Sequence, residues 1–206
     1  MGELMHVDLS FSLIGSQAVA ADHGYALYGA ISRLLPEVHR ENGIAVHPVR
    51  GRQVGNRQLM LMPWSTLTLR VVDAQIASLL PLAGKSIRIG NASIRVGVPT
   101  VSALAPSSAL RSRLVVIKVA NIKPESVTME QFAAAVRRQL DELGVSAEAI
   151  VTIGKRRTLR VKQRELVGYE VVVEGLTAEE SVSIQEQGLG GKRHMGCGVF
   201  VPIGQE

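Results

Sequence analysis

The stretch RRTLRVKQRELVGYEVVVE, residues 156–174, decides the fold of the C-terminal half of the chain. Apolar and polar residues alternate on both sides of Gln163–Glu165, which predicts two strands joined by a turn. Further strands are expected at residues 112–119 (SRLVVIKV), at residues 149–153 and in the terminal sequence CGVFVPI. The C-terminal half therefore contains the strands of a small antiparallel sheet.

Two capping boxes predict where the helices of this half begin. Thr128 with Gln131 opens one helix, which Gly144 ends, and Thr177 with Glu180 opens another that continues to about Gln187. The predicted order is strand–helix–strand–strand–helix–strand, which is the ferredoxin-like βαββαβ arrangement of RNA-recognition domains.

The N-terminal half has the same order of elements. Residues 6–13 alternate as a half-buried strand, and Asp22 is expected to cap a helix that bends or ends near Pro36. The remaining elements are short strands at 45–49 and within 58–72, a short helix that Asp73 caps, and a hairpin at 85–98. A basic turn, residues 50–57, separates the first two of these strands.

These patterns predict an α+β protein made of two tandem ferredoxin-like βαββαβ domains. The N-terminal domain is expected at residues 1–98 and the C-terminal domain at 111–206. Residues 99–110 (PTVSALAPSSAL) are rich in Pro, Ser and Ala and are interpreted as the linker. Because many unrelated proteins use this arrangement, the fold alone does not identify a function.

The composition excludes several classes of protein. Cys197 is the only cysteine of the 206 residues, so a disulfide framework is impossible and a cysteine zinc site is not expected. No leader pattern or membrane-length apolar run occurs, which favours a soluble, cytoplasmic protein. The formal charge is +5, and a basic chain tends to meet polyanions such as RNA.

The basic residues concentrate in one segment, residues 155–164 (KRRTLRVKQR), which holds six basic residues and no acidic one. On a hairpin, alternation would place Arg156, Thr158, Arg160 and Lys162 on one face and Arg157 on the other. Such a row of cations suits a phosphate backbone, although a charged edge strand protected from aggregation is the alternative. Because the chain has only seven aromatic residues, we expect phosphate contacts to outweigh base stacking.

A second segment of interest is the glycine-rich loop GLGGKRHMGCG, residues 188–198. Its glycines would let backbone amides approach an anion, and Lys192, Arg193 and His194 would add charge. It lacks the spacing of a nucleotide-binding P-loop, so a tight connector is an equal alternative.

None of the five histidines has metal-ligand spacing to another on one helix, and no HExxH motif occurs, so no metal is expected. His23 is expected in a solvated or capping role. His39 and His47 are candidates for proton transfer, because imidazole titrates near neutral pH.

Several segments together resemble the CRISPR-associated endoribonucleases that process repeat RNA, with the myxobacterial-type branch as the nearest likeness. They are ADHGYALYGAISRLLPEVH, SRLVVIK, RRTLRVK and GLGGKRHMGCGVFVP. The resemblance covers nearly the whole chain. It implies cleavage of the CRISPR precursor within each repeat, without a metal or other cofactor, by attack of the RNA's own 2′-hydroxyl. The products would carry a 2′,3′-cyclic phosphate and a 5′-hydroxyl.

The resemblance also implies roles for individual residues. His39 would be the general base and Tyr28 an orienting or acid group, with His47 as the alternative base. On one unbroken helix Tyr28 and His39 would stand roughly 16 Å apart, so a bend at Pro36 is required. The expected RNA contacts are Arg156, Arg157, Arg160, Lys162, Lys192, Arg193 and His194.

The resemblance further implies partners: a repeat RNA, expected to form a stem-loop, and other CRISPR-associated proteins of an interference complex. The enzyme would retain its product. Two other functions fit the same residues. One is a non-catalytic RNA-binding subunit of such a complex, and the other is a structural subunit whose basic face packs on an acidic protein.

Overall fold

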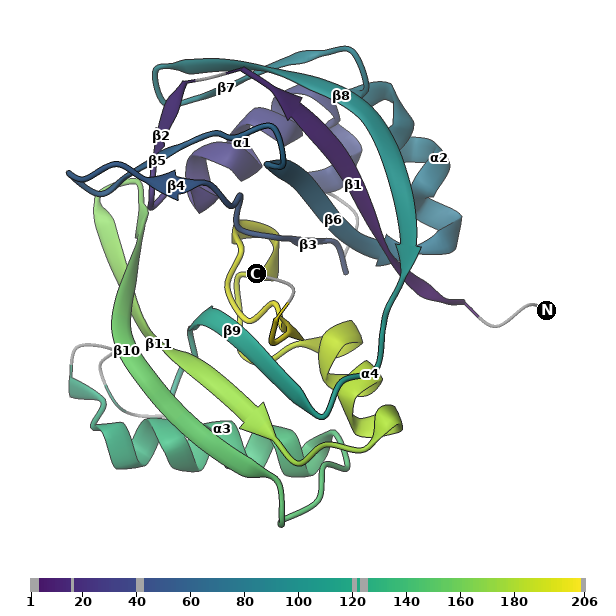
Figure 1. Ribbon diagram of the computed structural model, residues 1–206. Helices are drawn as coiled ribbons and strands as arrows, with labels where there is room; N and C mark the ends of the chain where they lie inside the picture. The colour runs from purple at the N-terminus through teal and green to yellow at the C-terminus, as the bar shows by residue number, and fades with distance from the viewer. Residues whose placement is uncertain (1–3, 16, 40–42, 120–121, 123–125, 205–206) are drawn as a thin grey trace. The chain divides into compact units, whose positions relative to one another are not determined.

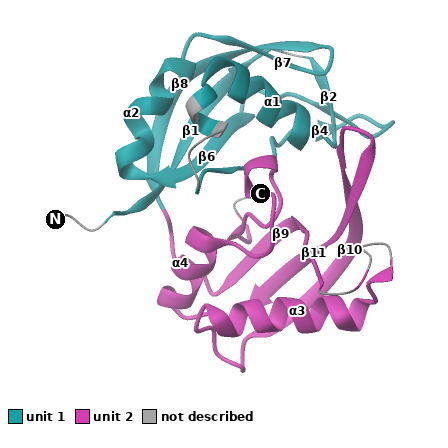
Figure 2. Ribbon diagram, turned by 180° about the vertical axis from the view of Figure 1, so that it is seen from behind, with its two compact units in different colours: residues 1–103 teal, residues 104–206 magenta. Residues whose placement is uncertain are grey.

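The computed structural model describes residues 4–15, 17–39, 43–119, 122 and 126–204, and for Glu37 and His39 it describes the backbone only. The chain divides into two compact units, residues 1–103 and 104–206 (Figure 2). Each unit has its own sheet and its own buried apolar residues. No helix in these residues is long and apolar enough to cross a membrane.

Unit 1 is built on a five-stranded antiparallel sheet in the order β3-β6-β1-β8-β7 (Figure 1). The strands are β1 (His6–Ile14), β3 (Ala45–Val46), β6 (Thr66–Val72), β7 (Ser86–Ile89) and β8 (Ala92–Ala103). A separate small sheet holds β2 (Ala18–Ala20), β4 (Arg52–Gln53) and β5 (Gln58–Met60). The segment predicted as a basic turn therefore forms a short hairpin instead.

The helices of unit 1 are α1 (Gly24–Leu34) and the four-residue α2 (Ile76–Leu79). Three short 3-10 helices accompany them: η1 (Pro36–His39), η2 (Asp73–Gln75) and η3 (Leu80–Leu82). The alternation predicted for residues 6–13 is confirmed, because Leu9 and Phe11 are fully buried while Asp8 and Ser10 are on the opposite face of β1.

Unit 2 has a four-stranded sheet in the order β10-β11-β9-β12. Its strands are β9 (Ala109–Val115), β10 (Ile150–Val161), β11 (Arg164–Glu174) and β12 (Val201–Pro202). Its helices are α3 (Met129–Glu142), α4 (Ala178–Gln187) and the 3-10 helix η5 (Arg193–Met195). Both predicted capping boxes are present at the starts of α3 and α4.

The two sheets share one topology, which confirms the α+β fold of ferredoxin-like halves. Each unit contains strand–helix–strand–strand–helix–strand, and the sheet order is second, third, first, fourth in both: β3-β6-β1-β8 and β10-β11-β9-β12. In unit 1, β7 and the small sheet are additions to this plan. In unit 2 the apolar residues of the sheet pack against α3 and α4 around Phe132, Val136 and Ile184.

Three details of the sequence interpretation were wrong. Most of the predicted linker, residues 99–110, belongs to strands, because β8 continues to Ala103 and β9 begins at Ala109. The helix α1 has His23, not Asp22, at its N-cap position. The hairpin turn lies at Lys162–Gln163, and Val161 pairs directly with Arg164.

Candidate functional site

A buried ionic cluster lies on the sheet face of unit 1 opposite the apolar core. Asp8 of β1 and Arg70 of β6 are cross-strand partners. Arg70 Nε lies 2.8 Å from Asp8 Oδ1, and Arg70 Nη2 lies 2.9 Å from Asp8 Oδ2. His47, just after β3, places its Nε2 3.3 Å from Asp8 Oδ1. The sequence therefore brings one of its two candidate bases beside a carboxylate.

The cluster keeps Asp8 ionised and His47 neutral. Burial alone would raise the pKa of Asp8, but contacts with His47 and Arg70 outweigh it and hold that pKa well below the usual carboxyl range. Burial lowers the pKa of His47; Asp8 opposes this shift, whereas the charges of Arg70 and Arg50 reinforce it. A neutral imidazole at pH 7 is the form that accepts a proton.

A second histidine, His23, has a structural role at the start of α1. Its side chain is buried, with Nδ1 2.8 Å from the carbonyl oxygen of Ala20 and Nε2 accepting a hydrogen bond from the amide of Val49 at 2.9 Å. Both ring nitrogens are therefore used to hold the segment after β3 against the start of α1. Of the two roles predicted for His23, the solvated one was wrong; the residue does occupy the N-cap position of α1, although its side chain makes no capping hydrogen bond.

The backbone breaks between Tyr28 and His39, as the bend requirement demands. Helix α1 ends at Leu34, Leu35 adopts a non-helical conformation, and Pro36–His39 form the separate turn η1. Tyr28 is buried on the core face of α1. The side chain of His39 lies outside the described residues, so its predicted role as the base stays a prediction.

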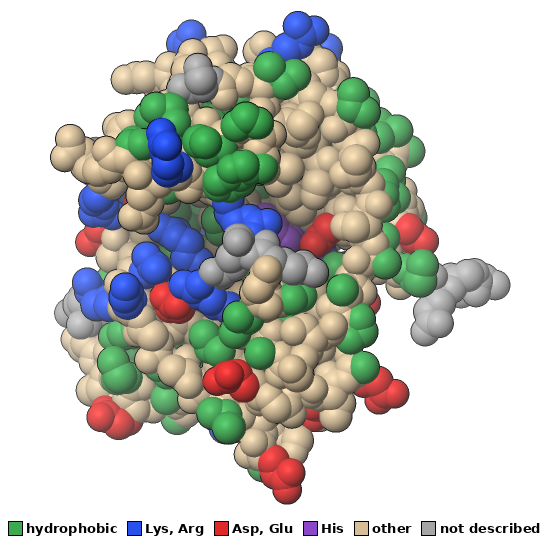
Figure 3. All heavy atoms as spheres, in the orientation of Figure 1, with side chains coloured by type: hydrophobic (Ala, Val, Ile, Leu, Met, Phe, Trp, Pro, Cys, Tyr) green, Lys and Arg blue, Asp and Glu red, His purple; other side chains and the backbone are tan. Residues whose placement is uncertain are grey.

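In unit 2, the β10–β11 hairpin divides the predicted basic row into two groups. Arg157 faces Glu170 at 3.3 Å, and Arg111 holds the other oxygen of the same carboxylate at 2.7 Å. Arg156 and Arg160 lie on the other face of β10 and are exposed, and Lys162 lies in the turn. Figure 3 shows Lys and Arg side chains gathered over the part of unit 2 that carries this hairpin. The predicted split of faces holds for the strand residues.

The glycine loop packs tightly against the end of β9. Its amides donate to protein groups: Gly198 to Leu114, Gly191 to Val116, and Gly190 to the side chain of Gln139 at 2.7 Å. A Cβ at Gly190 or Gly198 would overlap a backbone carbonyl oxygen, and both residues have positive φ. Of the two roles predicted for the loop, the structure favours the tight connector, because these amides are not available to an anion.

The charged residues of the loop take different positions. The guanidinium group of Arg193 donates to the carbonyl oxygen of Glu186 at the end of α4. His194 is half-buried and has an interaction partner. Lys192 is exposed, with a left-handed backbone (φ 67°). Of these three residues, Lys192 is exposed and the other two are half-buried.

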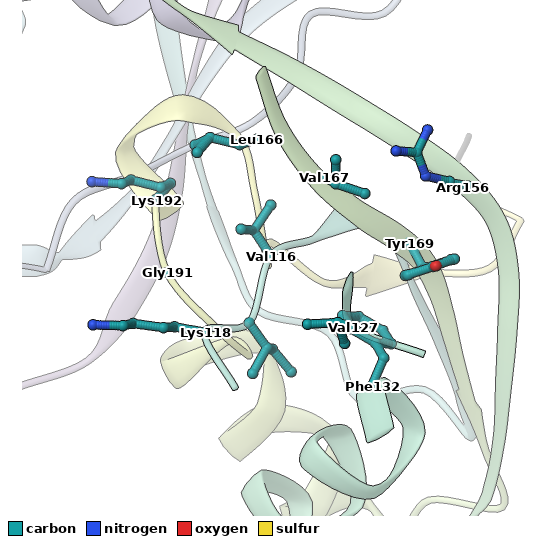
Figure 4. A pocket seen from close by; sticks show the side chains of 11 residues that line it. Val116, Lys118, Val127, Phe132, Arg156, Leu166, Val167, Tyr169, Gly191 and Lys192 are labelled. Atoms are coloured by element: carbon teal, nitrogen blue, oxygen red, sulfur yellow. The ribbon is translucent and has the colours of Figure 1, made fainter. Parts of the chain in front are cut away.

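Lys192 and Arg156 both line a pocket of about 330 Å³ within unit 2, on different sides of it (Figure 4). The pocket adds two residues that the sequence interpretation missed, Lys118 and Tyr169. A signal for Lys118 was present, because it directly follows the apolar strand run LVVI. The other lining residues are Val116, Ile117, Val127, Phe132, Leu166, Val167 and Gly191.

Comparison with known proteins identifies the family. The Cas6 family model, described as Cas6 Crispr, matches residues 7–205. This chain belongs to the Cas6 family. It is 39% identical over 206 residues to the CRISPR-associated endonuclease Cas6 of Myxococcus xanthus, covering 99% of this chain and 85% of the relative. The resemblance stated from the sequence is thereby confirmed.

Solved Cas6 structures share the fold. A CRISPR-associated protein Cas6 superposes with a TM-score of 0.65 at 15% identity, covering 98% of this chain and all of the other. The CRISPR endoribonuclease Cse3 bound to a 19-nucleotide RNA superposes with a TM-score of 0.54 at 15% identity, covering 96% and 98%. These Cas6 neighbours support the assignment of two ferredoxin-like halves.

Proposed function

We propose that this chain is an endoribonuclease that cuts the CRISPR precursor transcript within its repeats. The observation that carries the proposal is the family assignment over residues 7–205, together with 39% identity to a protein named as a CRISPR-associated endonuclease. The exposed cations of unit 2 support an RNA substrate, because they offer phosphate contacts.

The proposed chemistry needs no metal. A base takes the proton of the 2′-hydroxyl next to the scissile phosphate, and the 2′-oxygen attacks phosphorus. The bond from phosphorus to the 5′-oxygen breaks, and an acid protonates the departing oxygen. The products are a 2′,3′-cyclic phosphate and a 5′-hydroxyl, and a nearby cation stabilises the charge that develops on the phosphorane.

We assign the base to His39 and the orienting or acid role to Tyr28, with His47 as the alternative base. The geometry around His47 supports this order. Only 13% of its side chain is exposed, and its Nε2 is turned to Asp8, so Nδ1 is the nitrogen left for a substrate. The lowered pKa of His47 is compatible with base catalysis, but its burial restricts access to a 2′-hydroxyl.

The RNA contacts in the proposal are weighted by exposure. Arg156, Arg160, Lys162 and Lys192 are exposed and are assigned to phosphate binding. Arg157 and Arg193 remain candidates, but each already binds a protein group, Glu170 and the Glu186 carbonyl respectively. The enzyme retains its cleaved RNA and carries it into an interference complex.

Cleavage of a repeat RNA transcribed from the host's own CRISPR array tests the mechanism. Cutting should proceed in excess chelator and should stop when the cut-site nucleotide carries a 2′-deoxy substitution. A requirement for metal, or cleavage of the 2′-deoxy substrate, would contradict the mechanism. The salt dependence of binding separates an RNA-binding protein from a structural subunit, because phosphate contacts weaken steeply with salt.

Two histidine variants decide the base. His39→Ala should reduce single-turnover cleavage by at least about 100-fold, the usual contribution of a general base, without weakening RNA binding. Undiminished cleavage by this variant, with loss in His47→Ala, would transfer the role to His47. If both variants cut normally while the wild type is active, neither histidine is the base. The rival reading as a non-catalytic RNA-binding subunit requires that the wild type bind the RNA and leave it intact.

A further inference from the structure

The pocket of unit 2 has mostly apolar lining residues and three cations around them (Figure 4). Its walls are formed by β11, by the N-terminal end of α3 and by the segment after β9. Three cations border it, Lys118, Arg156 and Lys192, each from a different segment of the chain. None of the described residues that line it is acidic.

We infer that this pocket holds one unpaired nucleotide of the bound RNA, with the base in the chamber and its phosphates at the cations. The inference rests on the proposed function, because it takes RNA as the substrate. It adds that the protein reads an unpaired base in addition to holding the phosphate backbone.

The size of the pocket fits one nucleotide. Its volume of about 330 Å³ is at the lower end of the ~300–1,000 Å³ typical of small-ligand sites. A base inside a duplex is stacked on both faces and cannot enter such a chamber, so the bound nucleotide must be unpaired. The chamber is too small for a peptide segment of several residues.

An aromatic ring is available for the base. Tyr169 lies in the middle of β11 and is half-buried, and its ring centroid lies 4.8 Å from that of Phe132 at an angle of 51°. Phe132 is almost fully buried, so it fixes the ring of Tyr169 from the core side. Stacking of bases on aromatic side chains is tolerant of sequence because every base has a π-face. Half-buried Val116, Leu166 and Val167 complete apolar walls of the chamber.

The cations are placed by backbone structure. Arg156 is the direct cross-strand partner of Tyr169, so the two side chains leave the same face of the hairpin. The amide of Gly191 donates to the carbonyl oxygen of Val116 at 2.9 Å, which fixes the glycine loop beside the segment that carries Lys118. In Figure 4, Lys118 and Lys192 extend in the same direction from these two segments.

The conformation of Lys192 supports a binding role. Its φ of 67° is left-handed, a conformation that glycine adopts at lower cost and that neighbouring Gly190 and Gly196 also have. A strained non-glycine residue often marks a functional position. In the described part of the chain no acidic side chain pairs with Lys118, Arg156 or Lys192, so their charges are available to phosphate.

Abasic scanning of the repeat RNA tests the inference. The RNA carries a 2′-deoxy nucleotide at the cut site to prevent cleavage, and each unpaired position is made abasic in turn. With the wild type, one position should lose about 5- to 150-fold in affinity, the range of one base–aromatic stack. All other unpaired positions should change less.

Variants of the pocket then connect that position to the structure. Val167→Trp fills the chamber without changing charge. In this variant, removing the base at the sensitive RNA position should no longer weaken binding. The matched control is Val98→Trp on β8, where the valine is 78% exposed, and in this variant removal of the same base should still weaken binding.

Lys118→Ala should lower the slope of log affinity against log salt by about 0.7, which corresponds to one phosphate contact on a single strand. Arg138→Ala, a 64% exposed charge on α3 outside the pocket, should lower it less.

The outcomes separate this inference from the proposed function. If the wild type cuts the unmodified repeat RNA but no abasic position depends on Val167→Trp, the pocket inference is wrong and the proposed function stands. If free mononucleotides bind at the pocket but the scan finds no special position, the inference is also wrong. If the wild type neither binds nor cuts repeat RNA, both fail. Should Val167→Trp lose the native circular dichroism spectrum, Lys118→Ala decides, because an unchanged salt slope contradicts the inference.

Discussion

Replacing Asp8 with asparagine removes the charge that balances Arg70 inside unit 1. The two side chains share two contacts, of 2.8 and 2.9 Å, and Arg70 is only 1% exposed. Asparagine has nearly the same shape, but its amide nitrogen would face the guanidinium group as a second donor. At the position of the carboxylate, the variant therefore offers the buried guanidinium group at most one neutral acceptor.

The expected loss follows from burial. Removing one partner of a buried ion pair costs about 3–5 kcal/mol, because the remaining charge stays desolvated. Asp8 is 19% exposed and asparagine can still accept one hydrogen bond, so we expect about 3 kcal/mol. This loss is a large part of the ~5–15 kcal/mol by which a domain is stable.

Urea unfolding followed by circular dichroism at pH 7.5 measures the loss, and the chain supplies a matched control. On α3, Arg137 Nε also lies 2.8 Å from Asp141 Oδ1, but there the aspartate is 58% exposed. An exposed pair of this spacing along a helix contributes about 0.3–0.5 kcal/mol. Asp141→Asn should therefore destabilise unit 2 by no more than about 1 kcal/mol.

A result in which Asp8→Asn costs no more than Asp141→Asn would refute the reasoning from burial. The double variant Asp8→Asn with Arg70→Met adds a second check. It also removes the buried guanidinium charge, so it should recover part of the stability lost in the single variant. A double variant that is less stable than Asp8→Asn alone would show that Arg70 matters for packing and not for charge.

Three further predictions follow from single side chains. The free energy of unfolding should fall as pH drops from 7.5 to 5.5, because the imidazole of His47 takes up a proton in the unfolded chain but, with its lowered pKa, stays neutral in the folded protein. His47→Gln should therefore flatten the dependence of this free energy on pH, measured by urea titration at each pH. An unchanged slope would contradict the buried neutral state. Gly198→Ala should lower the midpoint of thermal unfolding by several degrees because its Cβ has no space, whereas Gly191→Ala, with no atom within 4 Å of the added Cβ, should leave it within about one degree. Arg157→Ala should reduce stability more than RNA affinity, since Arg157 binds Glu170, and Arg156→Ala should do the opposite; equal effects in filter binding and urea unfolding would count against this division.

Local patterns in the sequence were sufficient to predict the order of the elements. The hydroxyl groups of Thr128 and Thr177 each accept a hydrogen bond from the amide three residues later, at the start of a helix. Because both partners are close in the sequence, the start of each helix can be predicted from the sequence alone. The strand residues within 99–110 were missed because the composition of this stretch resembles that of a loop. Residues 99–103 nevertheless pair with β1, while β7 pairs only with residues 92–95 of β8. Pro99 is tolerated there because, among the described residues, no strand pairs with that edge of β8 beyond residue 95.

The ionic cluster of unit 1 could not be predicted in full, because it depends on the register between strands 62 residues apart. A weaker signal existed, since Asp8 and Arg70 are charged residues at the polar positions of two alternating strands. A charge at such a position has to find a partner when the strand becomes buried. The partner's identity follows only from the pairing of β1 with β6.

The basic residues of unit 2 show why net charge is a poor guide to a binding surface. Residues 155–164 contain no acid, yet Arg157 is paired with Glu170, which follows six residues after the segment and lies across the hairpin. Arg193 likewise binds a carbonyl at the end of α4. Side chains that the fold has already used contribute stability, and a phosphate would have to displace those contacts before it could bind.

The scarcity of aromatic residues has to be reconsidered on the same grounds. The presence of only seven aromatics in 206 residues led us to expect that phosphate contacts outweigh base stacking. Stacking one base, however, requires a single ring that is held in place and partly exposed, and Tyr169 meets both conditions beside Phe132 and Arg156. The count of aromatics therefore limits how many bases the protein can stack, whereas the position of Tyr169 determines whether it can stack one.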